Sequence, residues 1–265
     1  MPVPLSTLFS AAGNNPQPDI LSVVSTIDYQ DRKYCRIGRA KPFRPMSRFN
    51  ASAVQAAVFD MDGLIIDSEP IWQTSEIAVF SSHGLQLTRE DCMQTMGLRI
   101  DEVVEFWKSK QALADVDSRE LIEEILEKVI ESIRSNGTAM PGAEKTIRAL
   151  HTRMPIALAS SSFPEVIEAA LNRLELRSLF SVVHSAQKEK RGKPAPDVYI
   201  TACRMLQKAP EHCLALEDSP GGVSSALNAG MQVIAVPHPD HRNHPDILKA
   251  HLILESLEDF SWPAP

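Results

Sequence analysis

The sequence predicts an α/β protein in which a doubly wound parallel sheet carries an inserted all-helical domain. Short apolar runs recur along the chain from residue 54, helix-length segments separate them, and a long stretch after the first run has helical periodicity. Runs that are apolar at every position are typical of strands buried on both faces. Strands that alternate with helices favour right-handed crossovers within one sheet.

We expect six strands in this sheet. The first, Val54–Phe59, runs directly into two acids, which indicates a functional end. The other five predicted strands are Pro155–Ala159, Ser181–His184, Cys213–Leu216, Val233–Val236 and Leu252–Leu254.

Helices are expected between the later strands. Ser162 and Glu165 have the spacing of a capping box, and Pro164 suits a first helical turn. Ser219 is a predicted N-cap, and Gly230 stands just past the end of the same helix. The predicted helices are Phe163–Leu174, Asp197–Leu206 and Pro220–Asn228.

The stretch 72–139 is predicted to form a helical cap domain. Its clearest element is Ser118–Arg134, where apolar residues form one stripe at helical spacing and glutamates fill the other faces. The core domain is then expected from residues 54–71 and 140–265. The apolar stripe consists of Leu121, Ile122, Ile125, Leu126, Val129, Ile130 and Ile133.

Residues 1–53 differ from the rest of the chain. They are rich in Pro, Ser and Asn, and between Asp31 and Arg48 seven basic residues accompany a single acid. Such a segment is expected to be disordered. We interpret it as an extension ahead of a natural start at Met46, with a targeting or electrostatic arm as the alternative.

Composition limits the possible partners. The chain has 265 residues, 43% hydrophobic and 23% charged, with a formal net charge of −7. That charge argues against nucleic acid or an anionic membrane as a main partner. No apolar run approaches the ~18 residues of a membrane span. The four cysteines form no C-x-x-C pair and are expected to be free thiols. We therefore expect a cytoplasmic monomer.

Two acids at the end of the first strand carry the expected chemistry. Asp60 and Asp62 stand two residues apart in Phe59-Asp60-Met61-Asp62-Gly63. Carboxylates held close together need a cation, and Mg²⁺ prefers oxygen ligands. Asp60 could then attack phosphorus, while Asp62 handles the proton. Alone, this motif is equally typical of a calcium loop or a plain turn.

Three further strand ends support the catalytic interpretation. The second strand ends in Ser160 and Ser161, which could bind phosphoryl oxygens. Lys193 precedes a helix and could neutralise a phosphate, and the fourth strand ends in Glu217 and Asp218. Carboxyl ends of parallel strands meet in one crevice. We therefore predict one site for a small phosphorylated metabolite.

These motifs resemble the haloacid dehalogenase superfamily over about residues 54–260. The matching motifs are Asp60-Met61-Asp62-Gly63, Ser160, Lys193 and Glu217-Asp218. The resemblance implies that Asp60 is the nucleophile, Asp62 the general acid/base, and Ser160 and Lys193 the phosphoryl holders. It also implies Mg²⁺ ligation by Asp60, the Asp62 carbonyl and Asp218. Glu217 would be a further ligand, or a residue that supports the ligands without contacting the metal.

The segments Asp67–Trp72, Gly97–Asp101 and Ala215–Ser219 resemble the branch of hexitol and 2-deoxyglucose-6-phosphate phosphatases, near the β-phosphoglucomutases. This resemblance makes Glu69, Trp72 and Arg99 candidates for substrate contact, although Trp72 could instead anchor the cap hinge and Arg99 could pair with Asp101 or Glu102. A phosphosugar mutase and a phosphoglycolate phosphatase are alternative functions. A receiver-type phosphorylation switch also pairs such groups, but it is about half this length and has no cap.

Overall fold

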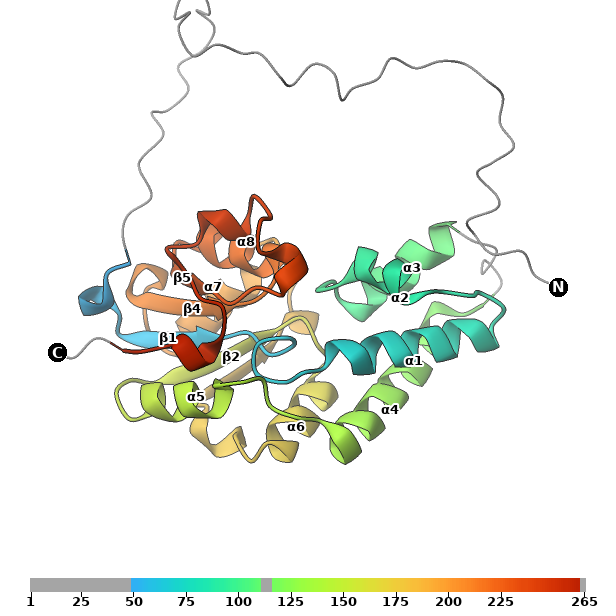
Figure 1. The fold of residues 1–265 in the computed structure, drawn as a ribbon, viewed down its shortest axis with the longest axis horizontal. Helices are drawn as coiled ribbons and strands as arrows, with labels where there is room; N and C mark the ends of the chain where they lie inside the picture. Colours follow the sequence, from blue (N-terminus) through green and yellow to red (C-terminus); the bar gives the residue numbers. More distant parts are fainter. Residues whose placement is uncertain (1–48, 111–115, 263–265) are drawn as a thin grey trace, which may run out of the picture. The chain divides into compact units, whose positions relative to one another are not determined.

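The computed structural model describes residues 49–110 and 116–262, and its central sheet has six parallel strands (Figure 1). Each predicted apolar run overlaps one of these strands, so the predicted fold class is confirmed. The strand order is β3-β2-β1-β4-β5-β6. The strands are β1 Ala56–Phe59, β2 Ile156–Ser160, β3 Val182–Ser185, β4 Cys213–Glu217, β5 Gln232–Ala235 and β6 Leu252–Ile253.

The register of the central strands brings the acids together. β1 pairs with β2 on one side and with β4 on the other, and Phe59 is opposite Leu216. The residues that follow, Asp60 and Glu217, therefore lie side by side at the carboxyl edge. Strands β2 and β3 extend the sheet on one side of β1. The chain then crosses to the other side of β1 and adds β4 to β6, so the direction of strand addition reverses between β1 and β4. Open sheets bind ligands at this kind of position.

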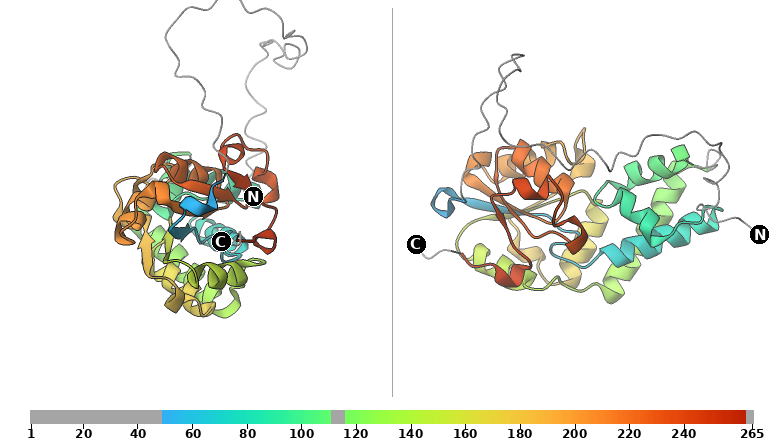
Figure 2. Two further views of the ribbon diagram at one scale, coloured as in Figure 1. Left: turned by 90° about the vertical axis from the view of Figure 1, so that its left-hand side faces the viewer. Right: turned by 45° about the horizontal axis from the view of Figure 1, so that its top comes forward.

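Alternate strand residues face two layers of helices. Phe59 and Leu216 belong to an apolar cluster shared with α5 and α6, whereas Val58 and Ala215 belong to a second cluster shared with α7 and α8. The two pairs of helices cover opposite faces of the sheet (Figures 1 and 2). These helices are α5 Ala143–His151, α6 Pro164–Arg173, α7 Asp197–Met205 and α8 Pro220–Asn228.

The insertion after β1 is helical, as predicted. The stripe expected on the longest cap helix is fully buried at Leu121, Ile125, Val129 and Ile133. This helix packs against both α1 and the core helix α6. The cap helices are α1 Glu69–Ser82, α2 Arg89–Cys92, α3 Ile100–Lys110 and α4 Ser118–Asn136.

Two neighbouring chain segments connect cap and core. The Asp67 amide donates to the Thr138 carbonyl at 3.0 Å, and the Met140 amide donates to the Ile65 carbonyl at 2.9 Å. α1 begins at Glu69, three residues ahead of the expected start of the cap at residue 72. Core and cap fall within one unit, Met46–Pro265.

The predicted capping box of α6 is wrong. The helix has Pro164 in its first turn as expected, but its N-cap is Phe163, which offers no side-chain cap. The Ser162 hydroxyl donates instead to an Asp62 carboxylate oxygen at 2.7 Å. This long-range partner takes the hydroxyl away from the end of the helix, so Ser162 belongs to the site and does not cap α6. In α8, by contrast, Ser219 accepts the Gly222 amide as the predicted N-cap.

Most of the segment expected to be disordered, residues 1–48, lies outside the described residues. The end of that segment, residues 49–53, is ordered: Ala51–Ala53 form a 3₁₀ helix, and the Phe49 ring packs edge-on against Trp262. Burial of this aromatic side chain offsets the entropy cost of ordering these residues.

Two smaller expectations also concern the described part of the chain. Cys92, Cys203 and Cys213 are buried free thiols, as predicted, and Cys35 lies outside the described residues. Within residues 49–110 and 116–262, no helix has both the length and the apolar character that a bilayer crossing requires.

Candidate active site

A buried lysine joins the ends of β1 and β4. The Lys193 ammonium donates to Asp60, and to Glu217 Oε1 at 2.6 Å. The lysine is 7% exposed. Burial by itself would lower its pKa, but the two carboxylates raise the pKa of Lys193 above its usual value. The lysine is therefore a fixed cation inside the cluster of acids.

The Glu217 carboxylate accepts hydrogen bonds at both of its oxygens. Its Oε1 accepts from Lys193 and from the Tyr199 hydroxyl at 2.7 Å. Its Oε2 accepts from the amides of Asp218 and Ser219, at 3.0 and 3.1 Å, and from the Ser219 hydroxyl at 3.2 Å. The carboxylate also lies at the N-terminus of α8, where a negative charge is favourable. These five donors fix Glu217 as an anchor for Lys193.

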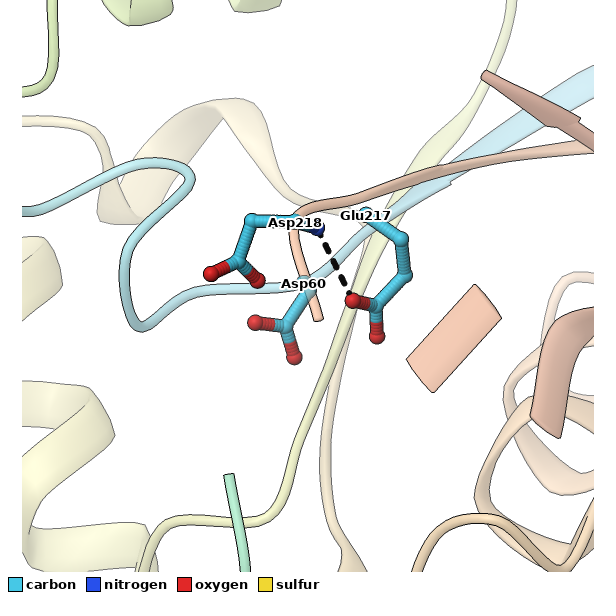
Figure 3. A group of neighbouring side chains, drawn as sticks. All are labelled: Asp60, Glu217 and Asp218. Carbon is cyan, nitrogen blue, oxygen red and sulfur yellow. Dashed lines mark hydrogen bonds between the residues drawn. The ribbon is translucent and has the colours of Figure 1, made fainter. Parts of the chain in front are cut away.

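Three acids form a group that could hold a metal ion. Asp60, Glu217 and Asp218 each offer an oxygen within 4.8 Å of the others (Figure 3). Asp218 Oδ1 is buried and has no hydrogen-bond partner among the residues that the structure describes. Burial raises the pKa of Asp218 well above its usual range and that of Asp60 to about 8, with Lys193 opposing the shift in both groups. An unpartnered buried oxygen among carboxylates fits a hard divalent cation.

Asp60 and Asp218 could hold such a cation through their side-chain oxygens. Both oxygens of Glu217 already accept hydrogen bonds, so this residue suits a supporting place behind the ligands. The Asp62 carboxylate stands apart from the three-acid group.

The Asp62 carboxylate accepts hydrogen bonds from both the core and the cap. Oδ1 accepts from the Ser68 hydroxyl at 2.6 Å and from the Trp72 indole at 3.0 Å. Oδ2 accepts from the Ser162 hydroxyl at 2.7 Å and from the Ser160 hydroxyl at 3.4 Å. Trp72 belongs to α1 of the cap. Ser160 is the last residue of β2, and Ser162 lies two residues further along the chain. The carboxylate therefore has one orientation, set by two domains.

Gly63 allows the chain to turn directly after the two acids. Its φ is +76°, and a Cβ there would lie 2.4 Å from Asp218 Oδ2. Both the backbone conformation and the close approach to Asp218 require glycine.

A cavity of about 280 Å³ opens in front of these groups. Most of the predicted site residues line it, from the core side and from the cap side. Its walls include the predicted residues Asp60, Asp62, Ser161, Lys193, Asp218, Glu69 and Trp72.

Ser160 is placed differently from the expectation. It is fully buried and is not among the residues that line the cavity. Its hydroxyl accepts the Ser162 amide at 3.0 Å and faces Asp62. Strand β2 ends with this residue pointing inward, so Ser161 and Ser162 form the cavity wall instead.

Arg99 is not brought to the cavity. Its guanidinium makes a two-pronged ion pair with Asp101, the alternative that the sequence left open. A third nitrogen reaches the carbonyls of Ala186 and Glu189 at 3.4 and 3.5 Å, which joins the start of α3 to a core loop. The neighbouring Asp101 carboxylate pairs with the guanidinium, so Arg99 holds cap to core in this structure.

Sequence reasoning missed three residues of the site: Ser68, Tyr199 and Glu76. Two of them act through hydroxyl groups whose direction depends on tertiary contacts. Glu76 is 6% exposed and lines the cavity. Its seven-residue separation from Glu69 along one helix was a usable signal, because this spacing places both on one face.

Comparisons with known proteins agree with one another. The family described as "Haloacid dehalogenase-like hydrolase" matches residues 57–236. Hexitol phosphatase B of Escherichia coli O157:H7 is 34% identical over 210 residues, which are 78% of this chain and 95% of that protein. (DL)-glycerol-3-phosphatase 2 of Arabidopsis thaliana is 30% identical over 228 residues, 80% and 92% of the two chains.

Solved structures show the same fold. CbbY from Rhodobacter sphaeroides in complex with phosphate superposes with a TM-score of 0.71 at 23% identity, covering 78% of this chain and 96% of that one. A β-phosphoglucomutase from Clostridium difficile gives a TM-score of 0.69 at 21% identity, covering 79% and 94%.

Gly222→Ala should disrupt the site, whereas Gly221→Ala should be tolerated. A Cβ at Gly222 would lie 1.7 Å from Glu217 Oε1, but at Gly221 nothing lies within 4 Å. We expect Gly222→Ala to lower the free energy of unfolding by about 2 kcal/mol or more and to lower activity with it. Urea unfolding and phosphate release would measure both effects. Equal behaviour of the two variants would contradict the role given to Glu217.

Glu76→Gln should change how stability depends on pH. Burial, reinforced by Glu69, raises the pKa of Glu76 to about 8. Unfolding lets this carboxyl ionise, so the wild type should lose stability as the pH rises from about 4.5 to about 8. The glutamine variant lacks this loss. We expect its advantage over the wild type to grow by roughly 2–4 kcal/mol between pH 5 and pH 8.

The measurement is urea unfolding across this pH range. Glu120→Gln, at an exposed position on α4, is the matched control and should follow the wild type. Parallel curves for the wild type and Glu76→Gln would show that Glu76 ionises freely in the folded protein.

Proposed function

The chain belongs to the haloacid dehalogenase-like hydrolase family, and from this premise we propose that it is a Mg²⁺-dependent phosphatase of small sugar or sugar-alcohol phosphates. Hexitol phosphates and 2-deoxyglucose 6-phosphate represent the proposed substrate type. One observation carries the proposal: Asp60 is paired with Lys193, while Asp62, two residues on, accepts hydrogen bonds from four side chains. These contacts support nucleophilic attack by Asp60 and proton transfer by Asp62.

In the first half of the proposed reaction, an Asp60 carboxylate oxygen attacks the phosphorus of the substrate. The bond between phosphorus and the leaving oxygen breaks, and Asp62, which enters this step in its protonated form, gives its proton to that oxygen and becomes a carboxylate. The product alcohol leaves, and an aspartyl-phosphate remains on Asp60. Lys193 balances the negative charge that the phosphoryl group brings to the carboxylates.

In the second half, water attacks the same phosphorus. Asp62, now a carboxylate, takes a proton from this water, and the bond between phosphorus and Asp60 breaks. Orthophosphate and free Asp60 result. The donors to Asp62 keep one orientation of its carboxyl group for both proton transfers.

Asp60, the Asp62 carbonyl and Asp218 would hold the cation, with Glu217 behind them. A bound Mg²⁺ supplies positive charge that offsets the repulsion among these carboxylates and the phosphate. The unpartnered oxygen of Asp218 supports this proposal.

Asp60→Asn should lower the rate of phosphate release by roughly 10³-fold or more, because an amide cannot act as the nucleophile. The assay is orthophosphate release from sorbitol 6-phosphate and p-nitrophenyl phosphate with Mg²⁺, together with acid-quenched transfer of radiolabelled phosphate to the chain. EDTA should stop the wild type, and added Mg²⁺ should restore it. Retained turnover or labelling in Asp60→Asn would overturn the mechanism.

Trp72→Phe should lower kcat by roughly 10- to 100-fold. The substitution keeps an aromatic ring but removes one hydrogen bond to a carboxylate, which is worth about 1.5–3 kcal/mol. Trp107→Phe in α3 is the matched control, because the Trp107 indole N–H is buried and has no partner within residues 49–110 and 116–262. Its kcat should stay near the wild-type value. Equal kcat for both variants would remove Trp72 from the positioning of Asp62.

A further inference from the structure

Acidic side chains outnumber basic ones among the described residues that line the cavity. Among the described residues that line the cavity, the only basic side chains are Lys193 and His238. Lys193 is already paired with two carboxylates. Beyond the Asp60–Asp218 cluster and Asp62, four further carboxyl groups line the cavity: Asp67, Glu69, Glu76 and Glu255, of which Glu255 forms an ion pair with Arg242. A second phosphate or a carboxylate on a substrate would meet repulsion here.

One face of α1 supplies the polar groups of this wall. Glu69, Gln73 and Glu76 are spaced four and three residues apart, which places them on the same side of the helix. All three line the cavity. The Gln73 amide donates to Glu69 Oε1 at 2.9 Å, which leaves the other Glu69 oxygen available to a ligand.

Glu76 is the deepest and least explained member of this face. It is 6% exposed, and no ion pair neutralises it in the described part of the chain. The Cys92 thiol and Glu69 are the titratable groups beside it. Thr95, Ile100 and Val103 also line this region of the cavity. A buried carboxyl without a charged partner is costly, so its presence at a cavity wall indicates a ligand.

Burial raises the pKa of Glu76 to about 8, so near neutral pH its carboxyl group keeps a proton. A protonated carboxyl can both donate and accept a hydrogen bond, as a sugar hydroxyl does. A site built around such a group rejects leaving groups that cannot satisfy it.

We propose that Glu76 is a specificity-determining residue, which hydrogen-bonds a hydroxyl of an uncharged leaving group while the surrounding carboxyls reject a second anionic group. This inference rests on the proposed phosphatase function and deepens it. The enzyme therefore prefers monophosphates of polyols or sugars to bisphosphates and to phosphorylated carboxylic acids. Glu69 and Gln73 bind further hydroxyls on the same face.

The first test compares four substrates with the full wild-type chain and Mg²⁺: sorbitol 6-phosphate, fructose 1,6-bisphosphate, 2-phosphoglycolate and p-nitrophenyl phosphate. We expect kcat/KM for sorbitol 6-phosphate to exceed that for the bisphosphate and for 2-phosphoglycolate by ~10²-fold or more. Comparable values for either anionic substrate would overturn the inference. No phosphate release from any of the four would instead overturn the proposed function.

The second test changes Glu76 itself. Glu76→Leu should lower kcat/KM for sorbitol 6-phosphate by ~10²-fold, mainly through KM, because an unpaired substrate hydroxyl would be buried against an apolar side chain. The loss on p-nitrophenyl phosphate, which has no hydroxyl groups, should be at least ~10-fold smaller. Glu76→Gln keeps a donor and an acceptor and should recover most of the lost activity, within ~10-fold of the wild type.

Glu120→Gln on the exposed face of α4 is the control and should match the wild type on every substrate. If Glu76→Leu lowers kcat/KM equally on sorbitol 6-phosphate and p-nitrophenyl phosphate, Glu76 has a structural role and the inference fails. If Glu76→Leu does not fold, the Glu76→Gln variant decides: a loss beyond ~10²-fold on sorbitol 6-phosphate would exclude simple hydrogen bonding to a hydroxyl.

Discussion

The site depends on a buried ammonium group shared between carboxylates from two strands. Lys193 lies between Asp60, at the end of β1, and Glu217, at the end of β4. Buried carboxylates this close together repel one another, and removing their cation would leave uncompensated charge in the interior. The Tyr199 hydroxyl and the start of α8 complete the support of Glu217, and Gly222 leaves room for its carboxylate. The same ion pairs therefore stabilise this edge of the sheet and position the Asp60 carboxylate.

The second constraint is the position of Asp62, which has partners in both domains. Ser162 approaches its carboxylate from the core, and Trp72 approaches it from the first cap helix. A cap that moved away from the core would carry the indole donor with it, because Trp72 belongs to α1. Cap position and proton transfer are thereby linked through one hydrogen bond. The Arg99–Asp101 pair adds a second cap–core contact at the start of α3, at the carbonyls of Ala186 and Glu189.

The sequence predicted the fold and the central acids because both depend on patterns that neighbouring residues impose. Runs buried on both faces identify strands, and acids at successive strand ends must meet in a parallel sheet, so Asp60, Lys193 and Asp218 could be placed together. Side-chain directions could not be predicted in the same way. Ser162 fits a local capping box, but the Asp62 carboxylate, a hundred residues away, is a better acceptor. The spacing of Glu76 from Glu69 indicates a shared helix face, but the burial of Glu76 depends on tertiary contacts that the spacing does not give.

One helix joins recognition of the leaving group to the chemistry. α1 carries Trp72, which donates to Asp62, and, one turn later, Glu76, which we assign to the leaving group. A helix is rigid over a single turn, so a hydroxyl bound at Glu76 fixes the distance from that hydroxyl to the indole. A leaving group of the right length then places its phosphoryl group at Asp60 while Trp72 keeps its bond to Asp62. A leaving group that α1 cannot accommodate would displace the helix and disturb proton transfer, so selection acts through the catalytic step as well as through binding.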